Sequence, residues 1–324
     1  MYIYNCISQF LQPCNKTLDP NLDLIPRTVI CVVGLVGNGI NMVIFRHPSM
    51  GPSTINTLLA ALAGSDTLVL IFSVIYFSVE GDMVQGVLAL LFSISRHCTL
   101  LLSLFVGLWR FFAITKALKA KGYCTPHNTR RAIVASVTVA VAFGIPQAVW
   151  QFGQQLDTET RDDLEKSFLW LNALVVLVFF VILTCLTIAM IISLVRSAWK
   201  KREMTQDASH KNEIKTTTML LMVMILTIAF YSPYMVSNFI LLASEVAVCR
   251  QPYITILILV NSLNNFFIFL FMSSNFQQIL KLYCCQIVEA ARCHICCHMF
   301  RRNTCCCPTQ PHGQSTNEIA LEDL

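Results

Sequence analysis

The chain has 324 residues, of which 55% are hydrophobic and only 13% are charged, and its mean hydropathy is +0.62. Soluble domains carry roughly 25% charged residues, so this composition excludes a soluble globular protein. The net charge of +5 is small, and no basic patch has the interleaved aromatic residues of a nucleic-acid surface. We therefore expect a membrane protein with membrane lipid, and no nucleic acid, as a partner.

Seven apolar stretches recur along the chain, and each is long enough to cross a bilayer as a helix. The hydrocarbon core is about 30 Å thick and needs roughly 20 helical residues. In lipid, a lone segment satisfies its backbone polar groups only as a helix. The pattern predicts an all-α membrane protein, a bundle of seven transmembrane helices occupying residues 27–275. The predicted spans are 27–46, 54–79, 86–113, 131–152, 168–196, 215–243 and 252–274.

The loops between the predicted spans differ in charge, and this difference sets the expected orientation. Basic residues gather after the third and fifth spans, and acidic residues gather after the second and fourth. Because basic loops stay on the cytoplasmic side, we expect a multi-pass protein of the plasma membrane with an extracellular N-terminus. The basic residues are Lys116, Lys119, Lys121, Arg130 and Arg131 in one loop and Arg196, Lys200, Lys201, Arg202, Lys211 and Lys215 in the other.

Residues 1–26 form the predicted extracellular tail. They lack an apolar run with a small-residue cleavage site, so we expect no removable signal peptide and assign insertion to the first span. Asn15 begins an acceptor triplet with Lys16 and Thr17, which makes it a candidate glycosylation site. Outside cysteines are free to oxidise, and a candidate disulfide joins this tail to the third outer loop. The cysteines concerned are Cys6 and Cys14 in the tail and Cys249 in the loop.

Isolated polar residues interrupt several of the predicted spans. An ionisable side chain at the bilayer centre costs at least about 2.5–3.5 kcal/mol, so such residues normally face the bundle interior. Those of the third span lie close to one helical face, and those of the seventh share another. Together they predict a polar seam through the bundle. The residues are Asn38, Asp66, Arg96, Thr99, Ser103, Arg110, Asn261, Ser262 and Asn265.

The chain beyond the last span is rich in cysteine. Residues 276–307 predict a short amphipathic eighth helix on the membrane surface, with Cys284 and Cys285 as candidate palmitoylation sites. Zinc binding is the rival interpretation, because residues 293–298 contain three cysteines and two histidines, which are zinc-ligand types. Residues 308–324 predict a disordered cytoplasmic tail. The seven histidines are scattered and form no Ser-His-Asp or paired-carboxylate pattern, so we expect no enzyme.

The arrangement of these polar residues resembles that of the rhodopsin-like G-protein-coupled receptors. Asn38, Asp66 and Pro233 match the family's helix-one asparagine, helix-two aspartate and helix-six proline. Arg110 matches the arginine of its Asp-Arg-Tyr motif, and Asn265 the asparagine of its Asn-Pro-x-x-Tyr motif. The resemblance implies a receptor that binds an extracellular ligand and activates a heterotrimeric G protein.

Two other segments are similar to those of invertebrate FMRFamide-type peptide receptors. They are residues 112–131 in the second inner segment and, around the start of the second span, 53–56, 62–63 and 65–70. This resemblance implies an amidated neuropeptide as the ligand. The candidate ligand-binding residues are Phe92, Arg96, Tyr231, Tyr234 and Asn238.

The family's switch implies specific roles for four residues. Glu213, twenty residues before Pro233, matches the acid that in many relatives pairs with the helix-three arginine. We expect Arg110 and Glu213 to form a latch and helix six to hinge near Pro233. Asn265 belongs to the same switch. Separation of the latch would then release helix six.

The family's sodium site has counterparts here, which makes a bound Na⁺ the one candidate cofactor. A hard cation takes oxygen ligands, but a hydrogen-bonded polar core with water is an equal alternative. Arg96 lies about 21 Å of helix from Arg110. It would bind an acidic group of the ligand or form an internal ion pair with Asp66, and we favour the ion pair because buried charges are usually paired. The counterparts are Asp66, Thr99, Asn261, Ser262 and Asn265.

Several departures from the family pattern keep other functions open. Gln85 stands where relatives have the helix-three cysteine of a disulfide, and Trp109 stands where they have the acid beside the arginine. Phe266 replaces the helix-seven proline, and Tyr231 replaces the helix-six tryptophan. A divergent receptor-like protein that does not couple is therefore one alternative. A small transporter or channel is another, although no internal repeat supports it.

Overall fold

The computed structural model describes residues 20–50, 53–79, 81–115, 122–152, 158–200, 208–244 and 252–300. Within these ranges the chain is helical apart from short connections, and it contains no strand. The chain divides into two units, Met1–Phe276 and Gln277–Leu324, and each is described by itself. The all-α bundle predicted from the sequence is confirmed.

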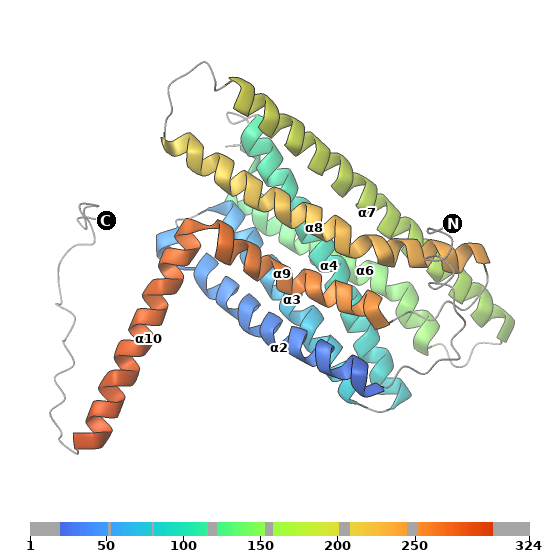
Figure 1. Cartoon of the computed structure of the whole chain (residues 1–324). Helices are drawn as coiled ribbons and strands as arrows, with labels where there is room; N and C mark the ends of the chain where they lie inside the picture. Colours follow the sequence, from blue (N-terminus) through green and yellow to red (C-terminus); the bar gives the residue numbers. More distant parts are fainter. Residues whose placement is uncertain are drawn as a thin grey trace, which may run out of the picture. The chain divides into compact units, whose positions relative to one another are not determined.

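Each predicted span coincides with one helix to within one or two residues at its end, and five of the helices extend beyond their spans by several residues (Figure 1). Six are long and apolar enough to cross a membrane by length and composition: α2, α3, α4, α7, α8 and α9. The remaining bundle helix, α6, contains the predicted span 131–152 and carries Arg130 and Arg131 in its first turns. The elements are α2 (Pro20–Phe45), η1 (Pro48–Met50), α3 (Thr54–Ser78), α4 (Asp82–Thr115), α6 (Pro126–Phe152), α7 (Thr158–Lys200), α8 (Ala208–Ser244), α9 (Pro252–Met272) and α10 (Ser274–Phe300).

Local sequence explains where several helices begin. Helices α2, α6 and α9 each start at a proline, which suits the first helical position because its missing N–H would have no partner there. The hydroxyl of Thr125 accepts a hydrogen bond of 3.2 Å from the backbone N–H of Asn128 and so caps α6. Ser273 caps α10 in the same way, accepting from the N–H of Phe276 at 3.3 Å. These signals separate α9 from α10 at a single residue.

The bundle is organised around α4. This helix packs against α3, α6, α7 and α8. The other contacts close a ring, in which α2 packs on α3 and α9, and α8 packs on α7 and α9 (Figure 1). Side chains of α4 therefore face several helices at once, which explains why the polar residues of the third predicted span meet partners on different helices.

The bundle is apolar on its outside and contains polar residues inside. Large apolar side chains such as Val36, Val134 and Leu174 are more than half exposed, at 60%, 64% and 58%. Asn38 and Asp66 are completely buried. Such an exterior suits lipid and not water, since exposed apolar patches of this extent are rare on soluble proteins. The protein is therefore a multi-pass membrane protein.

Two glycines allow close helix packing. A Cβ atom on Gly37 of α2 would lie 2.7 Å from Cγ of Phe266 on α9. A Cβ atom on Gly107 of α4 would lie 2.8 Å from Cε of Met224 on α8 and 2.9 Å from Cδ2 of Leu186 on α7. Small residues at helix interfaces are the usual means of close packing in membranes. Phe266, which replaces the family's proline, thus fills the space that Gly37 leaves.

Helix α8 contains Pro233 in its interior, where a proline removes one backbone hydrogen bond. The carbonyl that loses its donor is that of Ala229, four residues earlier. The hydroxyl of Ser232 donates to this carbonyl at 2.9 Å. The neighbouring serine therefore satisfies the polar group that the proline exposes.

The second unit contains α10 from Gln277 onwards. Apolar side chains on it are exposed, among them Leu282, Ile287 and Val288. Cys284 and Cys285 are free thiols with exposed side chains. The predicted helix after the bundle is present and reaches Phe300. Palmitoylation of these cysteines stays a prediction.

Candidate functional site

A buried polar network centres on Asp66 of α3. Its Oδ1 accepts a hydrogen bond from Thr99 Oγ1 of α4 at 3.2 Å, and its Oδ2 accepts from Asn265 Nδ2 of α9 at 2.8 Å. Thr99 Oγ1 also lies 2.9 Å from Ser65 Oγ, which donates to the carbonyl of Ser95 at 3.0 Å. Three helices are thus joined through one carboxyl group.

The network continues from α9 to α2. Asn38 Nδ2 donates to the backbone carbonyl of Ser262 at 2.9 Å, and Asn41 Nδ2 lies 3.4 Å from Asn38 Oδ1. Ser262 Oγ and Asn261 Nδ2 are buried and have no hydrogen-bond partner among the described residues. The predicted polar seam therefore runs across α2, α3, α4 and α9.

The residues predicted to bind sodium lie in this network. Asp66 offers two carboxylate oxygens, and the unpartnered Ser262 Oγ is a further buried oxygen. Oxygen ligands of this kind suit a hard cation. In the described part of the chain no three His, Cys, Asp or Glu residues gather, so nothing there favours a transition metal. The sodium site stays a prediction.

A second group of polar residues surrounds Tyr234 and is called the second polar layer: Arg96, Asn172, Tyr234 and Asn238. Arg96 lies three residues before Thr99 on α4. Its side chain is only 4% exposed, and its Cζ lies 4.1 Å from the centre of the Tyr234 ring on α8. Its Nε and Nη1 atoms have no hydrogen-bond partner among the described residues. The expected ion pair between Arg96 and Asp66 is wrong, because Thr99 and Asn265 bind the carboxylate while the guanidinium lies over Tyr234.

Amide groups surround Tyr234. Asn172 of α7 donates through Nδ2 to the Tyr234 hydroxyl at 3.0 Å and lies 3.3 Å from Asn238 Oδ1. Asn238 Nδ2 donates to the backbone carbonyl of Tyr234 at 2.8 Å. Asn172 was not among the predicted site residues, although an amide inside an apolar span is itself a signal of an inward-facing residue.

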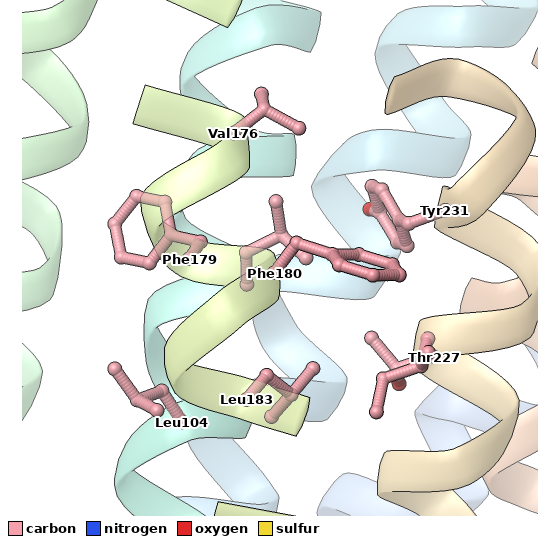
Figure 2. Close-up of a pocket in the computed structure, with 9 residues that line it drawn as sticks. Leu104, Val176, Phe179, Phe180, Leu183, Thr227 and Tyr231 are labelled. Carbon is pink, nitrogen blue, oxygen red and sulfur yellow. The ribbon is translucent and has the colours of Figure 1, made fainter. Parts of the chain in front are cut away.

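An apolar hollow lies between α4, α7 and α8 (Figure 2). Its cavity volume is only about 20 Å³, so in this structure the side chains almost fill it. Figure 2 shows Phe180 reaching from α7 toward α8, where Tyr231 and Thr227 project into the same space. The lining residues are Leu100, Leu104, Val176, Phe179, Phe180, Leu183, Thr227, Ile228 and Tyr231.

The five predicted ligand-binding residues lie in one region of the bundle. Tyr231 and Tyr234 are buried in a single apolar cluster, and Phe92 packs against it. Arg96 and Asn238 are buried beside Tyr234. The structure adds the face of α7 from Asn172 to Leu183, which sequence analysis did not include. The binding role of these residues stays a prediction.

At the predicted cytoplasmic end, Arg110 contacts α8. Its Nε donates to Thr217 Oγ1 at 2.9 Å, and Thr217 is buried. Glu213, the predicted partner of Arg110, belongs to α8 one turn earlier, but its side chain lies outside the described residues. The predicted latch between Arg110 and Glu213 stays a prediction. The observed contact nevertheless joins the same two helices.

Trp109 joins the same end of α4 to α6. Its Nε1 donates to Thr129 Oγ1 at 3.2 Å, and that hydroxyl lies 2.9 Å from the carbonyl of Thr125. The thiol of Cys124 lies 3.8 Å from the Trp109 carbonyl, and burial raises the pKa of this thiol above its ordinary value. The residue that replaces the family's acid thus has a structural partner that the sequence pattern did not reveal.

Gln85 also has a local role. Its Nε2 donates to the carbonyl of Val79 at 2.9 Å, across the connection between α3 and α4. A hydrogen bond therefore holds the start of α4 where relatives have a disulfide. The other predicted sites at this side, Asn15, Cys6, Cys14 and Cys249, lie outside the described residues.

Comparisons with known proteins agree with this geometry. Residues 37–269, most of the chain, match the family model described as 7 transmembrane receptor (rhodopsin family). The chain is 24% identical over 294 residues to the FMRFamide receptor of Drosophila melanogaster, covering 78% of this chain and 52% of the relative. It is 26% identical over 129 residues to the FMRFamide peptide receptor frpr-18 of Caenorhabditis elegans, covering 36% of this chain and 30% of the relative. The chain spans about half the length of the Drosophila relative. It belongs to the rhodopsin family of seven-transmembrane receptors.

Proposed function

We propose that this protein is a neuropeptide receptor of the plasma membrane that activates a heterotrimeric G protein. The observation that carries the proposal is the hydrogen bond from Arg110 on α4 to Thr217 on α8 at the predicted cytoplasmic end. A contact between two helices that can form or break is the kind of two-state element that a ligand can bias.

Helix α8 contains both the tyrosines proposed to bind the ligand and the residue that contacts Arg110. Tyr231 and Tyr234 flank Pro233, and Thr217 lies sixteen residues earlier, about 24 Å along the helix. Ser232 satisfies the Ala229 carbonyl, so the helix can bend at Pro233 without leaving a polar group bare in lipid. A ligand that moves the two tyrosines would therefore move Thr217 relative to Arg110.

The names of the two relatives support an amidated peptide of the FMRFamide type as the ligand. Five residues around the second polar layer would bind it: Phe92, Arg96, Tyr231, Tyr234 and Asn238. We also propose an extracellular N-terminus with glycosylation at Asn15 and palmitoylation at Cys284 and Cys285. The basic inner loops would contact the G protein.

The experiment is ligand-evoked nucleotide exchange. The full chain is reconstituted in lipid nanodiscs with purified G-protein trimers and exposed to a library of amidated peptides, including those ending in Arg-Phe. Exchange evoked by one of them supports the proposal. Peptide binding with no exchange on any trimer would favour a receptor-like protein that does not couple, an alternative motivated by Trp109 and Phe266.

A further inference from the structure

Arg96 is a buried charged group that has no acidic partner among the described residues. Only 4% of its surface is exposed, and the N–H groups at Nε and Nη1 have no hydrogen-bond partner among the described residues. A guanidinium is always ionised, and a buried charge that lacks hydrogen bonds is costly unless something binds it. The cation–π contact with Tyr234, 4.1 Å from Cζ to the ring centre, offsets part of this cost but leaves the N–H groups unsatisfied.

The buried acid of the first polar network, Asp66, is already bound by other residues. Asp66 accepts hydrogen bonds from Thr99 and Asn265, one at each carboxylate oxygen. Among the described residues, no ion pair joins Asp66 to Arg96. Two neutral amides, those of Asn172 and Asn238, flank Tyr234. They form hydrogen bonds with each other and with the tyrosine. The positive charge of Arg96 is therefore not neutralised within the described part of the chain.

The apolar hollow begins one helical turn from this layer on all three helices. Leu100 follows Arg96 by four residues on α4, and Val176 follows Asn172 by four on α7. On α8, Tyr231 lies three residues from Tyr234. Residues three or four apart lie on the same helical face. The polar layer therefore lies directly at one end of the apolar space shown in Figure 2.

We propose that this layer is a carboxylate-binding subsite, in which Arg96 binds a carboxylate of the ligand next to the apolar side chains that line the hollow. A carboxylate matches the planar fork of a guanidinium and forms charge-assisted hydrogen bonds with it. Ligand sites commonly combine apolar walls with a few oriented polar groups. This inference rests on the proposed function, because it assumes that the region between α4, α7 and α8 is the ligand site.

A carboxylate-binding Arg96 would require a ligand that carries a carboxylate. A C-terminal amide carries no charge, so in an amidated peptide the carboxylate would come from an aspartate or glutamate side chain next to an apolar residue. A free C-terminus or a small carboxylic acid would supply the same chemistry. A cationic group placed at this layer would be repelled by Arg96.

The test compares acids with their neutral isosteres on the purified receptor in nanodiscs. The probes are acetyl-Leu-Glu-Phe-amide against acetyl-Leu-Gln-Phe-amide, acetyl-Leu-Phe acid against its amide, and phenylacetate against phenylacetamide. Thermal stabilisation and binding affinity are measured without any G protein. We expect at least one acid to bind the wild-type protein about tenfold to a hundredfold more tightly than its neutral partner, as one charged hydrogen-bonded pair would give. The pair that shows the preference identifies the source of the carboxylate.

Substitutions of Arg96 test whether this residue causes the tighter binding of acids. Arg96→Gln should abolish it, and Arg96→Lys should keep a weaker preference, because the charge remains without the fork. Arg27→Gln is the matched control, since Arg27 also lies over an aromatic ring, 4.2 Å from the centre of Phe77 on the outer part of α2. A purely structural Arg96 would instead weaken acid and neutral probes alike and lower the Tm of the unliganded protein.

Equal binding of acids and neutral partners by the wild-type protein in all three pairs would overturn the inference, as would a preference that survives in Arg96→Gln. Binding that prefers acids but evokes no nucleotide exchange would support the inference and contradict the proposed function. Nucleotide exchange evoked equally by acids and their neutral partners would support the proposed function and contradict the inference.

Discussion

Replacing Thr217 by valine tests the contact between α4 and α8. The substitution keeps the side-chain volume nearly constant and removes the oxygen that accepts from Arg110 Nε at 2.9 Å. Hydrogen bonds to charged groups contribute about 1.5–3 kcal/mol, whereas polar pairs between membrane helices average about 0.6 kcal/mol. Arg110 is half-buried. We therefore expect the Arg110–Thr217 hydrogen bond to stabilise the state in which it is formed by about 0.6–1.5 kcal/mol.

This free energy corresponds to a threefold to tenfold change in the ratio of the two states, at about 1.4 kcal/mol per factor of ten. If the active state is populated at about 1% without ligand, Thr217→Val should raise it to roughly 3–10%. The assay is basal nucleotide exchange by purified G protein on nanodisc-embedded receptor. Unchanged basal exchange in a receptor that responds to ligand would refute the proposed role of the contact.

Thr218→Val is the matched control for this experiment. Its hydroxyl donates to the carbonyl of Ile214 at 3.0 Å within α8 and is not the acceptor of the Arg110 hydrogen bond. Basal exchange should therefore stay at the wild-type level. Glu213→Ala should also raise basal exchange if Glu213 pairs with Arg110. The double variant with Thr217→Val should then be non-additive, because both residues act on one guanidinium.

Three further substitutions test the packing of the bundle, each by the thermal unfolding of the purified protein. Gly37→Ala should destabilise by about 1–3 kcal/mol because its new methyl group meets the α9 ring, whereas Gly39→Ala, with open space, should leave the Tm unchanged. Trp109→Phe should cost about 0.5–1.5 kcal/mol through the lost indole hydrogen bond, while Trp170→Phe, at a 60% exposed site, should cost less. Ser232→Ala should lower the Tm because it leaves a carbonyl next to Pro233 without its donor; an unchanged Tm would contradict that account.

The fold was predictable because lipid imposes one strong constraint. A helix must cover about 30 Å of hydrocarbon, and apolar length located the six helices that meet this requirement. The predicted fourth span also lies in a helix of the bundle, α6. The helix ends were less predictable. α7 begins at Thr158, ten residues before its predicted span, because a helix may continue into water where hydropathy carries no signal. The proline starts and the Ser273 cap account for the ends that local sequence does encode.

The candidate site was predictable where a residue's surroundings depend on its own helix. Asp66, Thr99 and Asn265 meet as expected, because each is a polar residue on the inner face of an apolar helix. The partner of Arg96 was not predictable, because two helices offered competing groups at similar depth. Only the packing decides that the guanidinium lies over Tyr234 and that the carboxylate goes to the amide and hydroxyl donors.

The indole of Trp109 has a consequence for the receptor's response to acidity. A carboxylate at this position gains a proton as the medium becomes acidic and then loses its charge, which would loosen whatever it holds. The hydrogen bond from the indole to Thr129 involves two groups that do not titrate in the physiological range. The anchoring of α4 to α6 should accordingly persist unchanged in acidified compartments such as endosomes.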